Sequence, residues 1–190
     1  MELISQLETV LRPELLQGLG TGNSLILEER QRNQDDTKVK LIGVSSPFLA
    51  VRMDKLNHLS ALKPERERWN QICDYLLIGQ SNGSDYAILV ELKTTLGERT
   101  KAKGKEQLLR SLPILEYLLS VCAAEYGSSE KSNLTIRYVL IAEKEHSKIY
   151  KRGSQRGRQG QLRQRQEPYK SIKVATFVEP TVHFAALAQG

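Results

Sequence analysis

The sequence predicts a single α/β domain in which a mixed central β-sheet is flanked by helices. Apolar runs with the length and composition of strands recur along the chain, at residues 39–44, 48–53, 73–78, 86–93, 134–142 and 172–178. Between the fourth and fifth of these runs, residues 107–122 repeat leucine at helical spacing. The chain has 190 residues, of which 39% are hydrophobic, so it can bury one substantial core. We therefore predict one domain over residues 1–190.

The N-terminal region predicts a helix followed by a turn. Apolar residues keep helical spacing over residues 2–18, with an interruption at Pro13. Residues 18–24 are rich in glycine but lack the lysine of a phosphate-binding loop, which favours a simple turn. Residues 25–30 are compatible with either a helix or a strand, and residues 31–37 form a polar loop.

A hairpin is expected at the centre of the chain. Residues 73–78 and 86–93 are strand-like, and the residues between them are dense in turn formers. Side chains two apart on a strand share a face, so Glu91 and Lys93 lie on the same side. Asp74 stands at the start of the preceding strand, which antiparallel pairing brings beside the end of the next. Two carboxylates and one ammonium therefore converge at one edge of the sheet.

This convergence predicts a cation site. Neighbouring carboxylates repel each other unless they share a proton or a cation, and hard oxygen ligands suit Mg²⁺, with Mn²⁺ as a substitute. Lys93 beside them can orient an attacking water or stabilise negative charge on a phosphate. The alternative is an exposed strand end at which Glu91 and Lys93 form an ion pair and Asp74 has no catalytic role.

At these residues the chain resembles the PD-(D/E)XK nuclease superfamily, whose pattern is an acid at the start of one strand, an acid-x-Lys tripeptide in the next, and then a helix. The resemblance implies a restriction-endonuclease-like core, with Asp74 and Glu91 as metal ligands and Lys93 as the catalytic lysine. Gln107 stands where the RecB-like branch carries a glutamine early in that helix, and as a catalytic residue it would orient the lysine or the water. Cys73 replaces the proline that gives the superfamily its name.

Members of the superfamily often contribute a further glutamate from the element before the first core strand. Glu28 or Glu29 stands at such a position, and Glu29 is included as a third metal ligand. The alternative is that both glutamates are the solvated, charged end of an element.

Two basic stretches are expected to contact a nucleic-acid backbone. The first lies close to the predicted cation site and includes Lys101, Lys103 and Lys105. The second, a predicted flexible loop at residues 147–167, carries Lys148, Lys151, Arg152, Arg156, Arg158, Arg163 and Arg165. With Glu167 as its one acid, this loop has a charge of 7 − 1 = +6, equal to the formal net charge of the whole chain. Its alternatives are a solvated hairpin tip or a surface for an acidic protein partner.

The remaining chain predicts further elements and a cellular compartment. Pro113 is expected to kink or divide the helix at residues 107–122, and residues 180–187 suggest a short closing helix. Cys73 and Cys122 lie in apolar contexts and are expected to be reduced and buried. Because there is no secretion signal and no run of about 18 apolar residues, we expect a cytoplasmic protein without a membrane span.

Together these features predict a metal-dependent nuclease that hydrolyses phosphodiester bonds, with DNA favoured over RNA. The resemblance implies a place in host defence or DNA repair. The alternatives are a non-catalytic nucleic-acid-binding module and a nuclease subunit that is active only within a larger complex. A protein partner or a homodimer remains open from the sequence.

Overall fold

The computed structural model describes residues 2–20, 22–29, 37–56, 71–127, 134–145, 163–165, 172–176 and 181–188. Within these residues the strands form two sheets. The central sheet has the order β1 (Leu16–Gln17), β4 (Phe48–Arg52), β5 (Tyr75–Ser81), β6 (Ser84–Leu96), β7 (Thr135–Glu145), β9 (Ile172–Thr176) and β8 (Arg163–Arg165). The smaller sheet has the order β10 (Thr181–His183), β3 (Thr37–Ile42) and β2 (Leu25–Glu29). The predicted α/β class with a mixed sheet flanked by helices is confirmed.

The central sheet is mixed because its connections differ. β4, β5 and β6 pair antiparallel, whereas β6, β7 and β9 pair parallel. The β5–β6 turn consists of Asn82 and Gly83, at φ 52° and 75°, which is the conformation of a two-residue hairpin turn. The strands therefore extend further into residues 79–84 than the sequence predicted. The parallel β6–β7 pair needs a crossover, which α2 (Glu98–Tyr126) supplies.

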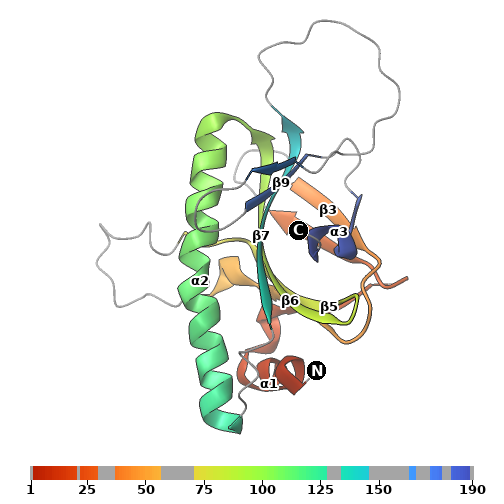
Figure 1. Cartoon of the computed structure of the whole chain (residues 1–190), viewed down its shortest axis with the longest axis vertical. Coiled ribbons are helices and arrows are strands. Elements are labelled where there is room, and N and C mark those ends of the chain that lie inside the picture. Colours follow the sequence, from red (N-terminus) through yellow and green to blue (C-terminus); the bar gives the residue numbers. More distant parts are fainter. Residues whose placement is uncertain are drawn as a thin grey trace, which may run out of the picture.

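α2 and α1 (Glu2–Val10) cover one face of the central sheet (Figure 1). α2 contributes Leu108 and Leu115, which pack with strand residues such as Leu89 in one buried cluster. By length and composition α2 is the one helix in the described part of the chain that could cross a membrane, and 39% of its apolar window is buried against the rest of the domain.

The prediction that Pro113 divides the helix is wrong, since α2 runs unbroken through it. A proline removes the bond to the carbonyl four residues earlier, here that of Leu109. Leu109 is 46% exposed, so the lost bond lies on a solvent-exposed turn of α2. The helix instead ends at Gly127, which adopts a left-handed conformation with φ 68°.

The smaller sheet and α3 (Phe184–Ala188) cover the opposite face of the central sheet. Leu27 and Leu41 of the smaller sheet pack with Ile88 and Val90 of β6 and with Phe184. β6 is thus buried on both faces, as its continuous apolar run predicted. The segment that the sequence left open between helix and strand is the strand β2.

At the N-terminus the helix is shorter than the helical spacing over residues 2–18 predicted. α1 ends at Val10, a single 3₁₀ turn follows over Pro13–Leu15, and Leu16–Gln17 form the strand β1. The predicted turn that follows is closed by a bridge between Gly20 and Ser24. The predicted closing helix is α3, but the sequence did not predict β10, which precedes it. Most of the predicted loop at residues 147–167 lies outside the described residues, and its part at 163–165 is the backbone of β8.

Candidate functional site

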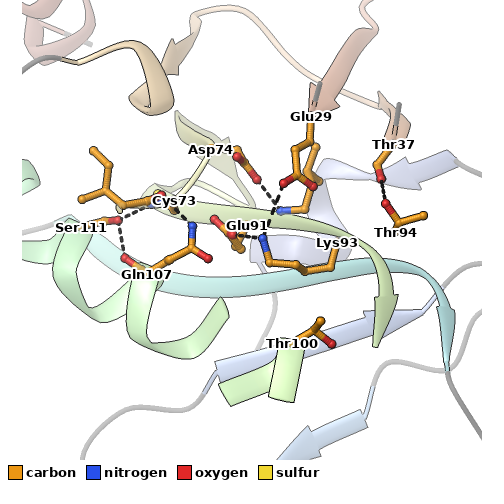
Figure 2. A network of polar contacts seen from close by, with 12 residues as sticks. Glu29, Thr37, Cys73, Asp74, Glu91, Lys93, Thr94, Thr100, Gln107 and Ser111 are labelled. Atoms are coloured by element: carbon orange, nitrogen blue, oxygen red, sulfur yellow. Dashed lines mark hydrogen bonds and ion pairs between the residues drawn. The ribbon is translucent and has the colours of Figure 1, made fainter. Parts of the chain in front are cut away.

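The two central strands bring the predicted catalytic residues together. Because Tyr75 pairs with Val90, Asp74 lies beside the segment that carries Glu91 and Lys93. Asp74 Oδ2 accepts a hydrogen bond of 2.7 Å from the backbone N–H of Leu92, which fixes this carboxylate against β6. Figure 2 shows Asp74, Glu91 and Lys93 converging at this point. The predicted convergence of two carboxylates and an ammonium is therefore present.

Burial dominates the electrostatics of the two carboxylates. Glu91 is fully buried, and Asp74 is 8% exposed. Burial raises the pKa of Asp74, the charge of Glu29 adds to the rise, and the bond from Leu92 opposes it. Burial likewise raises the pKa of Glu91, with Asp74 adding to the rise and Lys93 opposing it. Both groups therefore hold protons more tightly than free carboxyls.

Lys93 is the cation at the centre of the cluster. Its Nζ donates a hydrogen bond to Glu91 Oε1 and lies 3.7 Å from Glu29 Oε1. Burial alone lowers the pKa of Lys93, but the Glu91 carboxylate and then Glu29 and Asp74 oppose this, so the pKa is raised overall. The ammonium is thus held in its charged form by the surrounding carboxylates.

The structure distinguishes the two upstream glutamates. Glu28 Oε1 lies 3.1 Å from Lys38 Nζ, on the smaller sheet itself. Glu29, at the end of β2, reaches the Lys93 side chain and lies beside the cluster (Figure 2). Glu29 is therefore the third carboxylate of the site, and the four residues Glu29, Asp74, Glu91 and Lys93 are called the acidic cluster below.

Gln107 lies next to the acidic cluster but does not bind Lys93. Its Nε2 donates to the backbone carbonyl of Ile72 at 3.2 Å, while its Oε1 is buried without a hydrogen-bond partner. The same helix turn carries Ser111, whose Oγ accepts from the backbone N–H of Cys73 at 2.8 Å. α2 thus holds the two residues that precede Asp74, a contact that the sequence did not predict.

Gly104 allows α2 to approach the site closely. A Cβ atom at this position would lie 2.7 Å from Leu140 Cδ1 and 3.5 Å from Glu91 Cγ. The only sequence signal for this approach is a glycine within a helix, where glycine costs about 1 kcal/mol relative to alanine.

The donor set fits a hard divalent cation. Oxygen ligands suit Mg²⁺ or Mn²⁺, and Mg²⁺ keeps several waters, so it needs few protein ligands. Glu91 Oε2 is buried and has no hydrogen-bond partner among the described residues, as expected of an oxygen whose partner is an ion. Among the residues described, no group of three or more His, Cys, Asp or Glu side chains is arranged to hold a metal ion. Asp74 and Glu91 could hold the cation, with Glu29 as the nearest further carboxylate.

The first basic stretch belongs to the start of α2, not to a loop. Lys101 and Lys105 are partly exposed and Lys103 is exposed, so all three reach solvent near the acidic cluster. Of the second basic stretch, Lys148, Lys151, Arg152, Arg156 and Arg158 lie outside the described residues. Arg163 and Arg165 lie in β8, where the backbone alone is described.

No protein-family model, no curated protein and no solved structure matches the chain. The chemistry of the acidic cluster must therefore be inferred from its own residues.

Proposed function

We propose that the chain is a metal-dependent nuclease with a restriction-endonuclease-like core, which hydrolyses phosphodiester bonds in DNA in preference to RNA. The observation that supports this most is the convergence of two buried carboxylates and one half-buried carboxylate on one ammonium in the acidic cluster. Their order on the chain agrees with the PD-(D/E)XK pattern, because Asp74 precedes one strand, Glu91 and Lys93 lie on the next, and Gln107 lies on the helix that follows.

A purely structural ion pair does not account for the acidic cluster. One lysine neutralises one carboxylate, so ionisation of all three would leave a net charge of about −2 in a largely buried site. An unpaired buried charge is costly, and a protein without a ligand to bind would gain by replacing such groups with apolar ones. Without a cation the buried carboxyls keep protons, so the excess of carboxylates favours a cation as the partner that replaces those protons.

A Mg²⁺ or Mn²⁺ ion held by Asp74 and Glu91, with Glu29 beside them, would supply positive charge at the scissile phosphate. Lys93 Nζ would orient the attacking water and stabilise charge on a phosphate oxygen. The water oxygen attacks phosphorus and its proton passes to solvent, while the bond to the leaving oxygen breaks and that oxygen takes up a proton from solvent. Gln107 acts by fixing the chain ahead of Asp74. Lys101, Lys103 and Lys105 would contact the backbone of the substrate.

The test is Mn²⁺ titration by calorimetry followed by incubation with linear, circular and single-stranded DNA. We expect Asp74→Asn and Glu91→Gln to abolish both metal binding and cleavage. We expect Lys93→Met to lower cleavage by at least about 100-fold while metal binding persists. Glu106→Gln is the matched control, because Glu106 is an exposed carboxylate paired with Arg110 on α2. Full cleavage by any of the three variants would contradict the proposal.

The second candidate is a non-catalytic nucleic-acid-binding module, which the charge of residues 147–167 favours. Such a module would bind DNA equally well with a chelator present and would never cut it. Metal binding that depends on Glu91 without cleavage would instead indicate a nuclease subunit that needs a partner, as in an assembly of host defence or DNA repair.

A further inference from the structure

Glu29 reaches the acidic cluster from a different sheet than the other three residues. β2 pairs with β3, and β3 pairs with β10, but in the described residues none of these strands is paired through its backbone with the central sheet. The distance from Glu29 to Asp74, Glu91 and Lys93 is therefore not fixed by a strand ladder. It depends on the side chains that join the two sheets.

The first such side chain is Tyr75. Its hydroxyl accepts a hydrogen bond of 2.9 Å from the backbone N–H of Glu28 and donates one of 3.1 Å to the carbonyl of the same residue. Among the described strands β2 is the edge of the smaller sheet, and Tyr75 binds the backbone of Glu28 at this edge. Tyr75 is fully buried and directly follows Asp74. Tyr75, the residue after Asp74, is thus hydrogen-bonded to Glu28, the residue before Glu29.

The second joint is a pair of threonines. Thr37 Oγ1 and Thr94 Oγ1 lie 2.9 Å apart, within hydrogen-bond distance. Thr37 is the cross-strand partner of Glu29, and Thr94 directly follows Lys93. Figure 2 shows this pair beside Glu29 and Lys93. Two side-chain contacts therefore hold the strands that carry Glu29. One involves Tyr75, the neighbour of Asp74, and the other involves Thr94, the neighbour of Lys93.

A third contact holds β2 further from the site. Gln17 Nε2, on the edge strand β1, donates to the backbone carbonyl of Ile26 at 2.7 Å. This bond secures the far half of β2 but lies three residues from Glu29. The two joints at Tyr75 and Thr37 are the ones that act at the acidic cluster.

We propose that Tyr75 and the Thr37–Thr94 pair are positioning residues that place Glu29 as the third carboxylate of the cation site. This rests on the proposed function, and it adds that the smaller sheet is part of the metal-binding machinery. The tyrosine side chain itself does not touch the cation. It acts through the position of Glu29.

The test is Mn²⁺ binding by calorimetry without DNA, in two backgrounds. We expect Tyr75→Phe to weaken Mn²⁺ binding by about 10-fold, the range found when a group that orients a metal ligand is lost. In the Glu29→Gln background, which itself binds Mn²⁺ more weakly than wild type, Tyr75→Phe should cause no further loss. Tyr86→Phe is the control, because it removes a half-buried tyrosine hydroxyl of the same hairpin that has no hydrogen bond within the described residues.

Thr37→Val is the second variant, since it keeps the branched shape and leaves Thr94 partly exposed to water. Thr37→Val should likewise weaken Mn²⁺ binding in the wild type and cause no further loss in the Glu29→Gln background. It keeps the proposal testable if thermal unfolding shows that Tyr75→Phe is not folded. An equal loss of Mn²⁺ affinity in both backgrounds would make these residues merely structural and overturn the proposal. The positioning proposal would also be overturned if Glu29→Gln bound Mn²⁺ like the wild type while Glu91→Gln did not bind it. The proposed function would stand in that case. Absence of Mn²⁺ binding to the wild type would overturn both.

Discussion

At the scale of single residues, Glu91 determines the charge balance of the site. It is fully buried, one of its oxygens bonds Lys93, and the other has no hydrogen-bond partner. Asp74 differs, because a backbone N–H satisfies one of its oxygens at 2.7 Å. Burial raises the pKa of both carboxyls above the ordinary range. The metal-free protein therefore retains protons at this site that the unfolded chain releases.

This retention gives a pH dependence with a definite sign. Ordinary carboxyls lose their protons near pH 4, whereas Asp74 and Glu91 keep theirs to higher pH. From about pH 4 up to the raised pKa values, the folded state binds more protons than the unfolded state, so the free energy of unfolding falls as the pH rises. Each fully retained proton contributes a slope of about 1.4 kcal/mol per pH unit.

We therefore expect Glu91→Gln to flatten the decline in stability between pH 5 and pH 8, roughly the window in which the two states differ in bound protons. The measurement is urea unfolding at a series of pH values in the presence of a chelator. The exposed control Glu106→Gln should keep the wild-type slope. A Glu91→Gln variant with the wild-type slope would show that Glu91 is ionised in the folded protein.

At the scale of elements, α2 connects the parallel strands and also builds one wall of the site. Its glycine at position 104 lets it approach Glu91, and its serine at position 111 holds the backbone of Cys73. Its basic first turns lie next to the same cluster. The smaller sheet supplies Glu29 from the other side. The site is thus assembled from α2, the β5–β6 hairpin and the smaller sheet, which meet beside the middle of β6.

Two serines of α2 allow the wall contact to be tested. Ser111 and Ser120 each donate to the carbonyl four residues earlier, at 2.7 Å, but Ser111 is buried and also accepts from the N–H of Cys73. Ser111→Ala would leave that buried N–H unsatisfied, so we expect a loss of about 1–3 kcal/mol in the free energy of unfolding. Ser120 is exposed, and Ser120→Ala should change it by no more than about 0.5 kcal/mol.

Chemical denaturation of both variants is the measurement. Equal effects of the two substitutions would mean that the hydrogen bond from the Cys73 N–H to Ser111 contributes nothing to the free energy of unfolding. Because Cys73 precedes Asp74, cleavage should also fall in Ser111→Ala and not in Ser120→Ala.

At the scale of the whole molecule, the central sheet separates two buried clusters, one under α1 and α2 and one under the smaller sheet and α3. The acidic cluster lies where β2 ends and β5 begins, beside the middle of β6. The positive charge of the chain is concentrated in another segment. Residues 147–167 carry an excess of +6, which equals the formal net charge of the whole chain. The proposed cation site and the most basic segment are therefore separate parts of the sequence.

This separation predicts a specific salt dependence of DNA binding. We expect replacement of Lys151, Arg152, Arg156 and Arg158 by Gln to weaken DNA binding in a chelator, and to reduce the slope of log K against log salt by about 0.9 for each lost phosphate contact. Mn²⁺ binding should not change. Gln→Asn substitutions at residues 155, 159, 161 and 164 are the control, because they leave the charge of the segment unaltered. Unchanged binding in the charge variant would exclude this segment as the DNA contact.

What could be predicted from the sequence was local. A single tight turn joins β5 to β6, so the two-residue period of strands was enough to bring Asp74 beside Glu91 and Lys93. The leucine spacing of α2, the burial of β6 on both faces and the closing helix follow from similarly short-range patterns. The metal and the nuclease activity remain predictions that rest on this cluster.

The rest was decided by the tertiary structure. The choice of Glu29 over Glu28, the tie from Tyr75 to Glu28 and the Thr37–Thr94 pair link residues that are 47 and 57 positions apart in the chain. No period or motif encodes such contacts, because they depend on how the smaller sheet packs against the central one. The helix that continues through Pro113 and the close approach at Gly104 have the same origin. Packing, and not local propensity, determines them.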